Sequence, residues 1–526
     1  MDPFPRRRVT RSFQARGMTL QASALEAVMN VLRREEDCVG VLKDIVEACK
    51  ENSIGNAGIV TTDVLAAVIV DLTRNSKDIM DEAFQILNAY ETPRLYYDTM
   101  RKQFTLQRND DKSFFGEASD KIDMMAQRFA LVHQRILKQD VFRPKHTTAD
   151  GRQISSDSRH VTHSLCSIES LIGRKGCRFL LGMLVQVEEG KFYLEDFSAQ
   201  VPLDIREAEI LTDGFLAENC IILVEGEMID GTLYVHRMGN PIVETRLSAI
   251  QDIGLATTDM FQSISSLAQL EDIQQQETLH GSDGMLVVLS NVYLDNPQVM
   301  EKLKILFEGF LEMNPVYVFM GNFMSSGTSA KELLGYFEDL TRLICSMDGL
   351  AQKGRFIFLP GPRDPGLRGI LPQPALPKYC TQSLRNKVTH ATFATNPCRL
   401  RYFSKEIVLY RNDVVFQLQR SALVTPRESG STVIQHTVKT LLDQGHLAPY
   451  PRPIYWQHDH IMRLYPLPDA LIIGDSLDQY FENYAECDII NPGRFSHDFS
   501  FVVYRPIASI EKTKTKSEVE FSQIGN

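Results

Sequence analysis

The fold of this chain is decided by the stretch VVLSNVYLDN at residues 287–296, in which an apolar strand runs into a polar loop. The same pattern recurs in FMGNFMSS at 319–326, in FLPGPRDPG at 358–366, and in DALIIGDSL at 469–477 followed by INPGRF at 490–495. Amphipathic helical stretches separate several of these strands. Continuous apolar strands that alternate with amphipathic helices predict an α/β sheet covered on both faces. The loops after such strands are where an α/β fold carries its chemistry.

These loops, in this order, resemble those of the calcineurin-like metallophosphoesterases, which read D-x-H, G-D-x-x-D, G-N-H-D/E and G-H-x-H. Such an enzyme holds two metal ions ~3.5–4 Å apart with Asp, His and Asn side chains. In this chain the matching positions carry other residues: Asn291, Tyr293, Asn322, Ser325, Pro362, Arg363, Asp475 and Leu477. The resemblance therefore implies an inactivated phosphoesterase fold, and we expect no catalytic residue, metal ligand or cofactor site at these positions.

The chemistry of the replacements supports the same expectation. Asparagine lacks the negative charge that gives a site affinity for divalent cations. Pro362 has no ligand atom in its side chain, and the guanidinium of Arg363 stays cationic and repels metal. The remaining metal-ligating residue types at or near the pattern are Asp295, Asp364, Asp475 and His446. One imidazole does not assemble a two-metal centre.

Other catalytic patterns give no better candidate. The sequence contains no P-loop, no G-x-S-x-G elbow and no H-E-x-x-H motif. Its tightest ionisable cluster is His458–Asp459–His460, in the aromatic and proline-rich stretch IYWQHDHIMRLYPLPD. That context is typical of a packed connection rather than of a ligand set.

The composition of the sequence disfavours several classes of protein. The 526 residues carry a formal net charge of −11, which disfavours a protein whose main task is to coat nucleic acid. The nine cysteines are dispersed without a C-x-x-C pair, so we expect no structural zinc site. We expect the cysteines to be reduced thiols. We find no apolar run long enough to span a membrane. An arginine cluster within residues 1–16 is interpreted as a nuclear-import signal, as a mitochondrial presequence or as an exposed lead-in to the first helix.

The chain is predicted to begin with a helical domain, followed by a less regular connecting segment. Residues 1–92 show apolar positions at three- and four-residue spacing, which indicates a small helical domain. Residues 93–165 are interpreted as a connecting segment, with a hairpin in LYYDTMRKQFTL and one amphipathic helix in DKIDMMAQRFALVHQRILKQ.

Residues 166–245 predict five short strands with tight turns, which is typical of an OB-fold barrel, with a helix-like insert at 206–219. OB folds often bind single strands with aromatic side chains over a basic groove. Here Phe192, Tyr193 and Tyr234 are surrounded by more acidic than basic residues. We therefore expect a structural or protein-docking barrel, with at most weak or indirect contact with DNA.

The remaining boundaries follow from changes of pattern. Residues 246–284 are polar and are interpreted as a linker that wraps a flanking domain. Residues 285–526 form the phosphoesterase-like domain, and its polar tail EKTKTKSEVEFSQIGN is expected to be a loosely ordered extension. The predicted fold class is thus multidomain α+β: a small helical N-terminal domain, an OB-fold β-barrel and an inactivated calcineurin-like α/β domain.

This architecture resembles the B subunits of the eukaryotic replicative DNA polymerases. The epsilon type is favoured by FLPGPRDPG, ATNPCRLRYFSKEI, TLLDQGHLAPYPRPIYW, RLYPLPDALIIGDS and INPGRFSHDFSF. The resemblance implies a nuclear, non-catalytic subunit that holds the C-terminal zinc-module region of the polymerase epsilon catalytic subunit. It also implies docking of the N-terminal helices to the GINS part of the replicative helicase, small histone-fold subunits in the same complex, and no membrane partner.

Two alternatives stay open from the residues alone. One is a residual metal-dependent phosphoesterase or nuclease, which would bind manganese and hydrolyse a diester. The other is an independent OB-fold protein that binds single-stranded DNA, which would show salt-dependent binding by the barrel.

Overall fold

The computed structural model describes residues 83–107, 113–142, 163–262, 267–326, 329–367, 369–426, 430–511 and 514–525, with scattered positions before residue 61. The chain divides into two compact units, Met1–Gln85 and Ile86–Asn526. In the first unit, α1 (Arg6–Gln14) precedes a short parallel pair of β1 (Thr19–Leu20) and β2 (Ile59–Val60). The helical domain predicted for 1–92 lies largely outside the described residues and stays a prediction.

One part of that prediction is wrong. Within the predicted helical range 1–92, residues 84–88 form a strand, β3 (Phe84–Asn88). This strand is an edge of a six-stranded sheet in which its neighbour is β18 (Cys398–Tyr402). The hydrogen-bonding partner lies more than 300 residues away in the sequence, and tertiary pairing overrides local helix propensity at such a site.

The OB-fold prediction is confirmed by a closed five-stranded barrel. Its strands run in the order β13–β12–β7–β8–β9, and β13 also pairs with β9, which closes the sheet. The side chains that point inward are fully buried, among them Leu180, Leu184, Leu194, Val224 and Leu233. The strands are β7 (Arg178–Glu188), β8 (Lys191–Glu195), β9 (Gln200–Asp204), β12 (Ile221–Ile229) and β13 (Thr232–Gly239).

The prediction of a helix-like insert at residues 206–219 is wrong. This segment contains two short strands, β10 (Glu209–Ile210) and β11 (Leu216–Ala217), and β11 pairs with β20 (Ala422–Val424). Phe215, Leu216 and Ala217 are all buried, and the N–H of Phe215 donates to the hydroxyl of Thr440 at 2.7 Å. The apolar run fills the junction between the barrel and the following domain, so it does not form one face of a helix.

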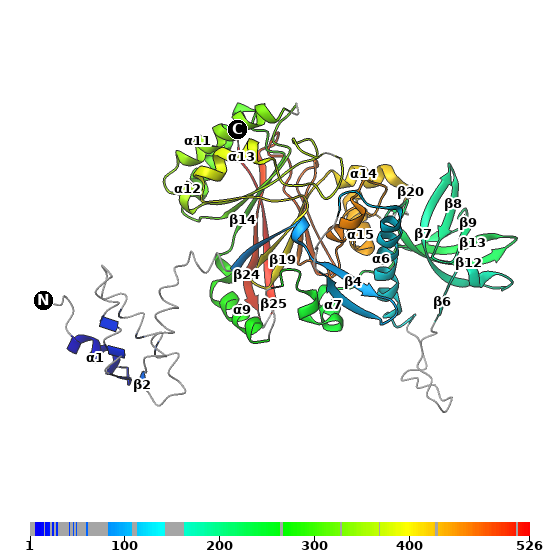
Figure 1. Ribbon diagram of the computed structural model, residues 1–526, viewed down its shortest axis with the longest axis horizontal. Coiled ribbons are helices and arrows are strands. Elements are labelled where there is room, and N and C mark those ends of the chain that lie inside the picture. The colour runs from blue at the N-terminus through cyan, green and yellow to red at the C-terminus, as the bar shows by residue number, and fades with distance from the viewer. Residues whose placement is uncertain are drawn as a thin grey trace. The chain divides into compact units, whose positions relative to one another are not determined.

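The last domain is built from two six-stranded sheets (Figure 1). The first has the order β17–β16–β15–β14–β24–β25, and β14 to β17 run parallel. The helices α10 (Pro297–Phe310), α11 (Ala330–Cys345) and α13 (Lys378–Lys387) supply apolar side chains to its outer core. The strands are β14 (Leu286–Ser290), β15 (Val316–Met320), β16 (Arg355–Leu359), β17 (His390–Phe393), β24 (Ser500–Glu511) and β25 (Lys514–Gln523).

The second sheet has the order β22–β23–β21–β19–β18–β3, and α14 (Val414–Ser421) and α15 (Val433–Gln444) join its outer core. The sheets meet near Gly474, where a Cβ would lie 2.6 Å from Ser290 Oγ and 3.1 Å from Met320 Sδ. One face of each sheet therefore packs on the other sheet, where we predicted helices on both faces. The new strands are β19 (Lys405–Arg411), β21 (Ala470–Gly474), β22 (Tyr480–Tyr484) and β23 (Cys487–Asn491).

The segment 93–165 contains the predicted hairpin, β4 (Arg94–Asp98) with β5 (Gln103–Gln107), and the predicted helix, α6 (Ala118–Leu137). Residues 246–284, which we interpret as a linker that wraps a flanking domain, contain three α-helices in their described part. These are α7 (Arg246–Ile253), α8 (Leu255–Thr258) and α9 (Leu267–His280). Arg246 lies 3.1 Å from Glu406 and 3.3 Å from Asp469, so ion pairs hold this polar segment on the second sheet.

The prediction of a loosely ordered extension at the C-terminus is also wrong. Most of it forms β25, which pairs antiparallel with β24 from Ser500↔Gln523 to Glu511↔Lys514. Thr515, Ser517 and Val519 are half-buried while the residues between them are exposed, the alternation of an edge strand. Among the described helices, none combines the length and apolar character that a membrane crossing needs.

Candidate functional site

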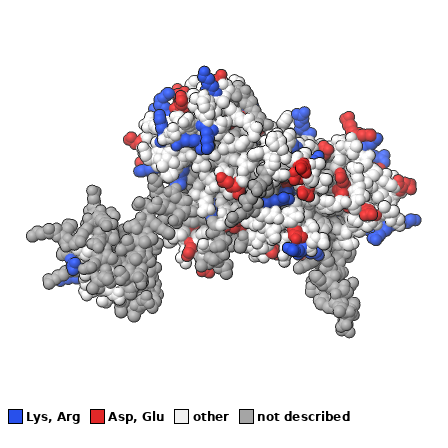
Figure 2. Space-filling model, in the orientation of Figure 1, with Lys and Arg blue, Asp and Glu red and all other residues white. Residues whose placement is uncertain are grey.

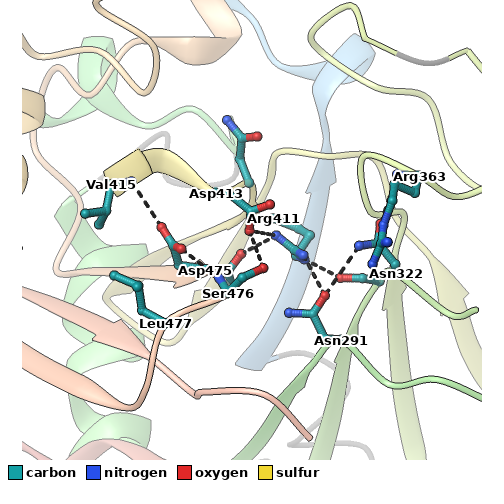
Figure 3. Close-up of polar contacts among 12 residues, drawn as sticks. Asn291, Asn322, Arg363, Arg411, Asp413, Val415, Asp475, Ser476 and Leu477 are labelled. Atoms are coloured by element: carbon teal, nitrogen blue, oxygen red, sulfur yellow. Dashed lines mark hydrogen bonds and ion pairs between the residues drawn. The ribbon is translucent and has the colours of Figure 1, made fainter. Parts of the chain in front are cut away.

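The loops that follow β14, β15, β16 and β21 converge at the carboxyl ends of the two sheets (Figure 3). Together with the end of β19 they form what we name the loop cluster: residues 291–295, 321–325, 361–364, 411–413 and 474–477. Arg411, the last residue of β19, lies at its centre and is fully buried.

The guanidinium of Arg411 joins loops from both sheets. Its Nη2 donates to Asn291 Oδ1 at 2.6 Å, and its Nη1 donates to the carbonyl of Gly474 at 2.8 Å and to Asp413 Oδ1 at 3.0 Å. Its Nε donates to the carbonyl of Gly321. Buried charges need such partners, because an unpaired buried charge is costly. One cation therefore organises the loops that follow β14, β15 and β21.

The two asparagines predicted to replace metal ligands use their amide oxygens inside the protein. Asn291 has a φ of +55°, a left-handed conformation that asparagine tolerates. Its Oδ1 accepts from Arg411 and, at 3.4 Å, from Asn322 Nδ2. Asn322 Oδ1 accepts from the N–H of Arg363 at 2.9 Å. Both side chains are buried, so each oxygen already has a donor in place of a metal ion.

The remaining replaced positions of the first three loops bind one another at the surface. Arg363 Nη2 donates to the hydroxyl of Tyr293 at 2.7 Å, and its Nη1 lies 3.5 Å from the carbonyl of Ser325. The Ser325 hydroxyl donates to Asp295 at 2.5 Å. Pro362 is half-buried and contributes no polar side-chain atom. These residues are thus joined by hydrogen bonds at the surface, and the backbone of Arg363 connects them to the buried Asn322.

Two carboxylates are buried at the edges of the loop cluster. Asp364 accepts backbone N–H groups at 2.7 and 2.8 Å, and Asp475 accepts others at 2.7 and 3.1 Å. Burial raises the pKa of each to about 6, although these hydrogen bonds oppose the shift. Leu477 is 37% exposed and points away from Arg411 (Figure 3).

His446 lies outside the loop cluster. It is buried, and its Nε2 is 3.1 Å from Asp459 Oδ1. Burial lowers the pKa of His446 to about 4. Asp459 also accepts from Arg128 Nε at 3.0 Å and from Arg463 at 3.0 and 3.1 Å. The His458–Asp459–His460 stretch is thus a packed connection, as predicted, in the 3-10 helix η4 (Trp456–Met462). Within the described ranges, no three His, Cys, Asp or Glu side chains gather as a metal site.

Arg411 is the residue that sequence reasoning missed. It ends the apolar strand KEIVLYR and is followed by Asn412 and Asp413. An arginine at the end of a strand whose other side chains are mostly buried is a signal for a buried ion pair, although the sequence does not show which loops it reaches.

The surface of the barrel carries both acidic and basic side chains. Tyr234 is 40% exposed, whereas Phe192 packs against the core. Glu225 and Arg237 form an ion pair on the barrel surface, so the arginine is already neutralised. Figure 2 shows acidic and basic side chains interspersed over this end of the molecule, without a single basic patch.

Comparison with known proteins identifies the family to which this chain belongs. The profile that describes the B subunit of DNA polymerases alpha and epsilon matches residues 286–482, and that of the DNA polymerase epsilon subunit 2-like OB-fold domain matches residues 118–242. The chain is 33% identical to the B subunit of DNA polymerase epsilon of Arabidopsis thaliana, over 95% of this chain and 97% of the relative. The chain belongs to the family of DNA polymerase epsilon B subunits.

Other members of this B-subunit family match over similar lengths. DNA polymerase epsilon subunit 2 of Homo sapiens is 32% identical over 95% of this chain and 96% of its own. The B subunit of DNA polymerase epsilon of Saccharomyces cerevisiae is 27% identical over 82% of this chain and 74% of its own. A B subunit is an accessory subunit, so this chain is not the catalytic polymerase subunit.

Proposed function

We propose that this B subunit is a non-catalytic scaffold of a nuclear DNA polymerase epsilon complex. The observation that carries the proposal is the buried Arg411 guanidinium, which donates to Asn291, Gly321, Asp413 and Gly474 at the centre of the loop cluster. A divalent cation about 4 Å from that charge would be repelled by about 8 kcal/mol at an effective dielectric constant of about 20. In this proposal the loops serve packing and partner contact.

No catalytic, metal-binding or cofactor-binding role is proposed for the eight replaced positions. Support comes from the asparagine amides, whose oxygens are engaged by Arg411 and by the N–H of Arg363. The set is Asn291, Tyr293, Asn322, Ser325, Pro362, Arg363, Asp475 and Leu477.

The partners proposed follow from family membership. We infer that the barrel and the two-sheet domain hold the C-terminal zinc-module region of the polymerase epsilon catalytic subunit. The dispersed cysteines of this chain support a zinc supplied by that partner. The N-terminal helical domain is proposed to dock to the GINS part of the helicase, with small histone-fold subunits in the same complex. Contact with DNA is weak or indirect, in keeping with the net charge of −11.

Co-expression with the C-terminal region of a polymerase epsilon catalytic subunit tests the scaffold. We expect a stoichiometric complex in size-exclusion chromatography at near-physiological salt, and two separate peaks would overturn the proposal. The purified chain alone is then assayed for manganese binding and for hydrolysis of a phosphodiester. Turnover that requires manganese and disappears in Asn291→Ala would show that the loops retain catalysis.

A further inference from the structure

A pocket of about 190 Å³ opens at the start of α6, away from the loop cluster. There α6 lies against β4 and η4, and the end of β4 lies beside α6 in Figure 1. The residues that line this pocket, which we name the α6–η4 pocket, are Arg94, Asp120, Met124, Trp456, Gln457, His460 and Arg463.

Two arginines give the α6–η4 pocket unused donors. The side chain of Arg463 is only 6% exposed; its Nε and Nη2 donate to Asp459 at 3.1 and 3.0 Å. Its Nη1 is buried and has no hydrogen-bond partner within the described part of the chain, and the same is true of Arg94 Nε. A buried N–H without an acceptor is costly, and native proteins satisfy nearly all such groups.

The local charges are not balanced. Asp459 is the shared partner of Arg463, Arg128 and His446, so one carboxylate serves two guanidiniums. Burial lowers the pKa of Arg463 to about 10, and the neighbouring Arg94 and Arg128 act in the same direction. Asp120 is the remaining acidic group of the pocket, and it accepts from Gln457 Nε2 at 2.9 Å and from the N–H of Glu117 at 2.7 Å.

Trp456 lines the pocket, and two phenylalanines precede α6 in the chain. Trp456 is 36% exposed, and Gly116 packs on it so closely that a Cβ would lie 3.1 Å from its ring. Phe115, in the turn before α6, is 91% exposed, and Phe114 is 46% exposed. Aromatic side chains beside a partly desolvated arginine are typical of sites where a partner protein anchors one side chain.

We propose that the α6–η4 pocket binds the carboxylate of an acidic side chain in a partner protein, with the apolar neighbours of that side chain packed on Trp456 and Phe115. The carboxylate accepts hydrogen bonds from the guanidiniums of Arg463 and Arg94, which both line the pocket. Three arginines (Arg94, Arg128 and Arg463) and two aspartates (Asp120 and Asp459) leave a single net positive charge, which matches a monoanion. Asp120 repels a phosphate dianion more strongly than it repels the single charge of a carboxylate. The inference does not depend on which protein supplies the segment.

Trp456 is the only tryptophan in the chain, so its fluorescence reports on this pocket alone. The full chain is titrated with a capped heptapeptide, Gly-Ser-Leu-Glu-Leu-Ser-Gly, and with the same peptide carrying Gln in place of Glu. We expect a saturable change with the Glu peptide below about 10 mM and none with the Gln peptide. Equal responses, or no saturation, would overturn the proposal.

Variants separate a carboxylate site from a general anion site. Arg94→Gln lowers the affinity of the protein for the Glu peptide by about tenfold, since one charge-assisted hydrogen bond is lost. Arg101→Gln, at the exposed far end of the β4–β5 hairpin, leaves binding unchanged. Asp120→Asn strengthens binding, because it removes the competing charge. Tighter binding of inorganic phosphate or of a single-stranded oligonucleotide than of the Glu peptide contradicts the proposal, as does an unchanged affinity in both Arg94→Gln and Asp120→Asn.

Discussion

Arg411 Nη2 donates to Asn291 Oδ1 at 2.6 Å, and this bond joins the end of β19 in one sheet to the loop after β14 in the other. The calcineurin-like metallophosphoesterases carry a metal-binding aspartate at the position of Asn291. In this protein the side chain at that position binds the guanidinium of Arg411 instead. The same guanidinium reaches Gly321, Asp413 and Gly474, so the loop cluster has a fixed geometry without an added ion.

Replacing Arg411 by methionine is expected to destabilise the fold by about 3–5 kcal/mol, because it leaves several buried acceptors without a donor. Urea unfolding followed by circular dichroism measures the change. Arg420→Met, on the exposed end of α14, is the matched control and is expected to stay within about 0.5 kcal/mol. A similar loss in the two variants contradicts the central role of Arg411.

Asn291→Asp alone is expected not to create a manganese site. The new carboxylate lies within hydrogen-bond distance of Arg411 and forms an ion pair with it, so it does not become a free ligand. Isothermal titration with manganese should show no heat of binding. Stoichiometric binding by this variant would mean that Arg411 can leave the centre of the loop cluster.

The buried Asp364 is expected to make stability fall as the pH rises. Burial raises its pKa from 3.8 to about 6, so the folded state holds the proton more tightly than the unfolded state. Its contribution is fully present below pH ~4 and is lost as the pH rises through ~6, with a size of at most about 3 kcal/mol. Unfolding free energies of the wild type and of Asp364→Asn, measured at several pH values, isolate this slope. Parallel curves for the two proteins contradict it.

Leu216→Ala is expected to cost about 2–5 kcal/mol, because Leu216 is fully buried between the barrel and the two-sheet domain. Leu211, in the same insert, is 58% exposed, and Leu211→Ala should change stability by less than about 0.5 kcal/mol. Thermal unfolding of the two variants measures the difference. Equal effects would mean that the insert does not seal this junction.

Local patterns in the sequence were sufficient for several elements. The five barrel strands alternate inward and outward side chains, and α6 repeats apolar positions at helical spacing, so each could be predicted from its own residues. The replaced ligands are also visible in the sequence, because ligand chemistry depends on residue type. The insert at 206–219, the helices of 246–284 and β25 could not be predicted, since their structure depends on distant partners such as β20, Glu406 and β24.

The sequence by itself thus determined which loops lie at the strand ends, and that their side chains lack the charge and the imidazoles of a two-metal centre. Only the tertiary structure decided what stands there instead. Arg411 lies 120 positions after Asn291, and no local pattern connects them. Packing one sheet on the other brings the two together, and burial then requires that the guanidinium be paired with the loops around it.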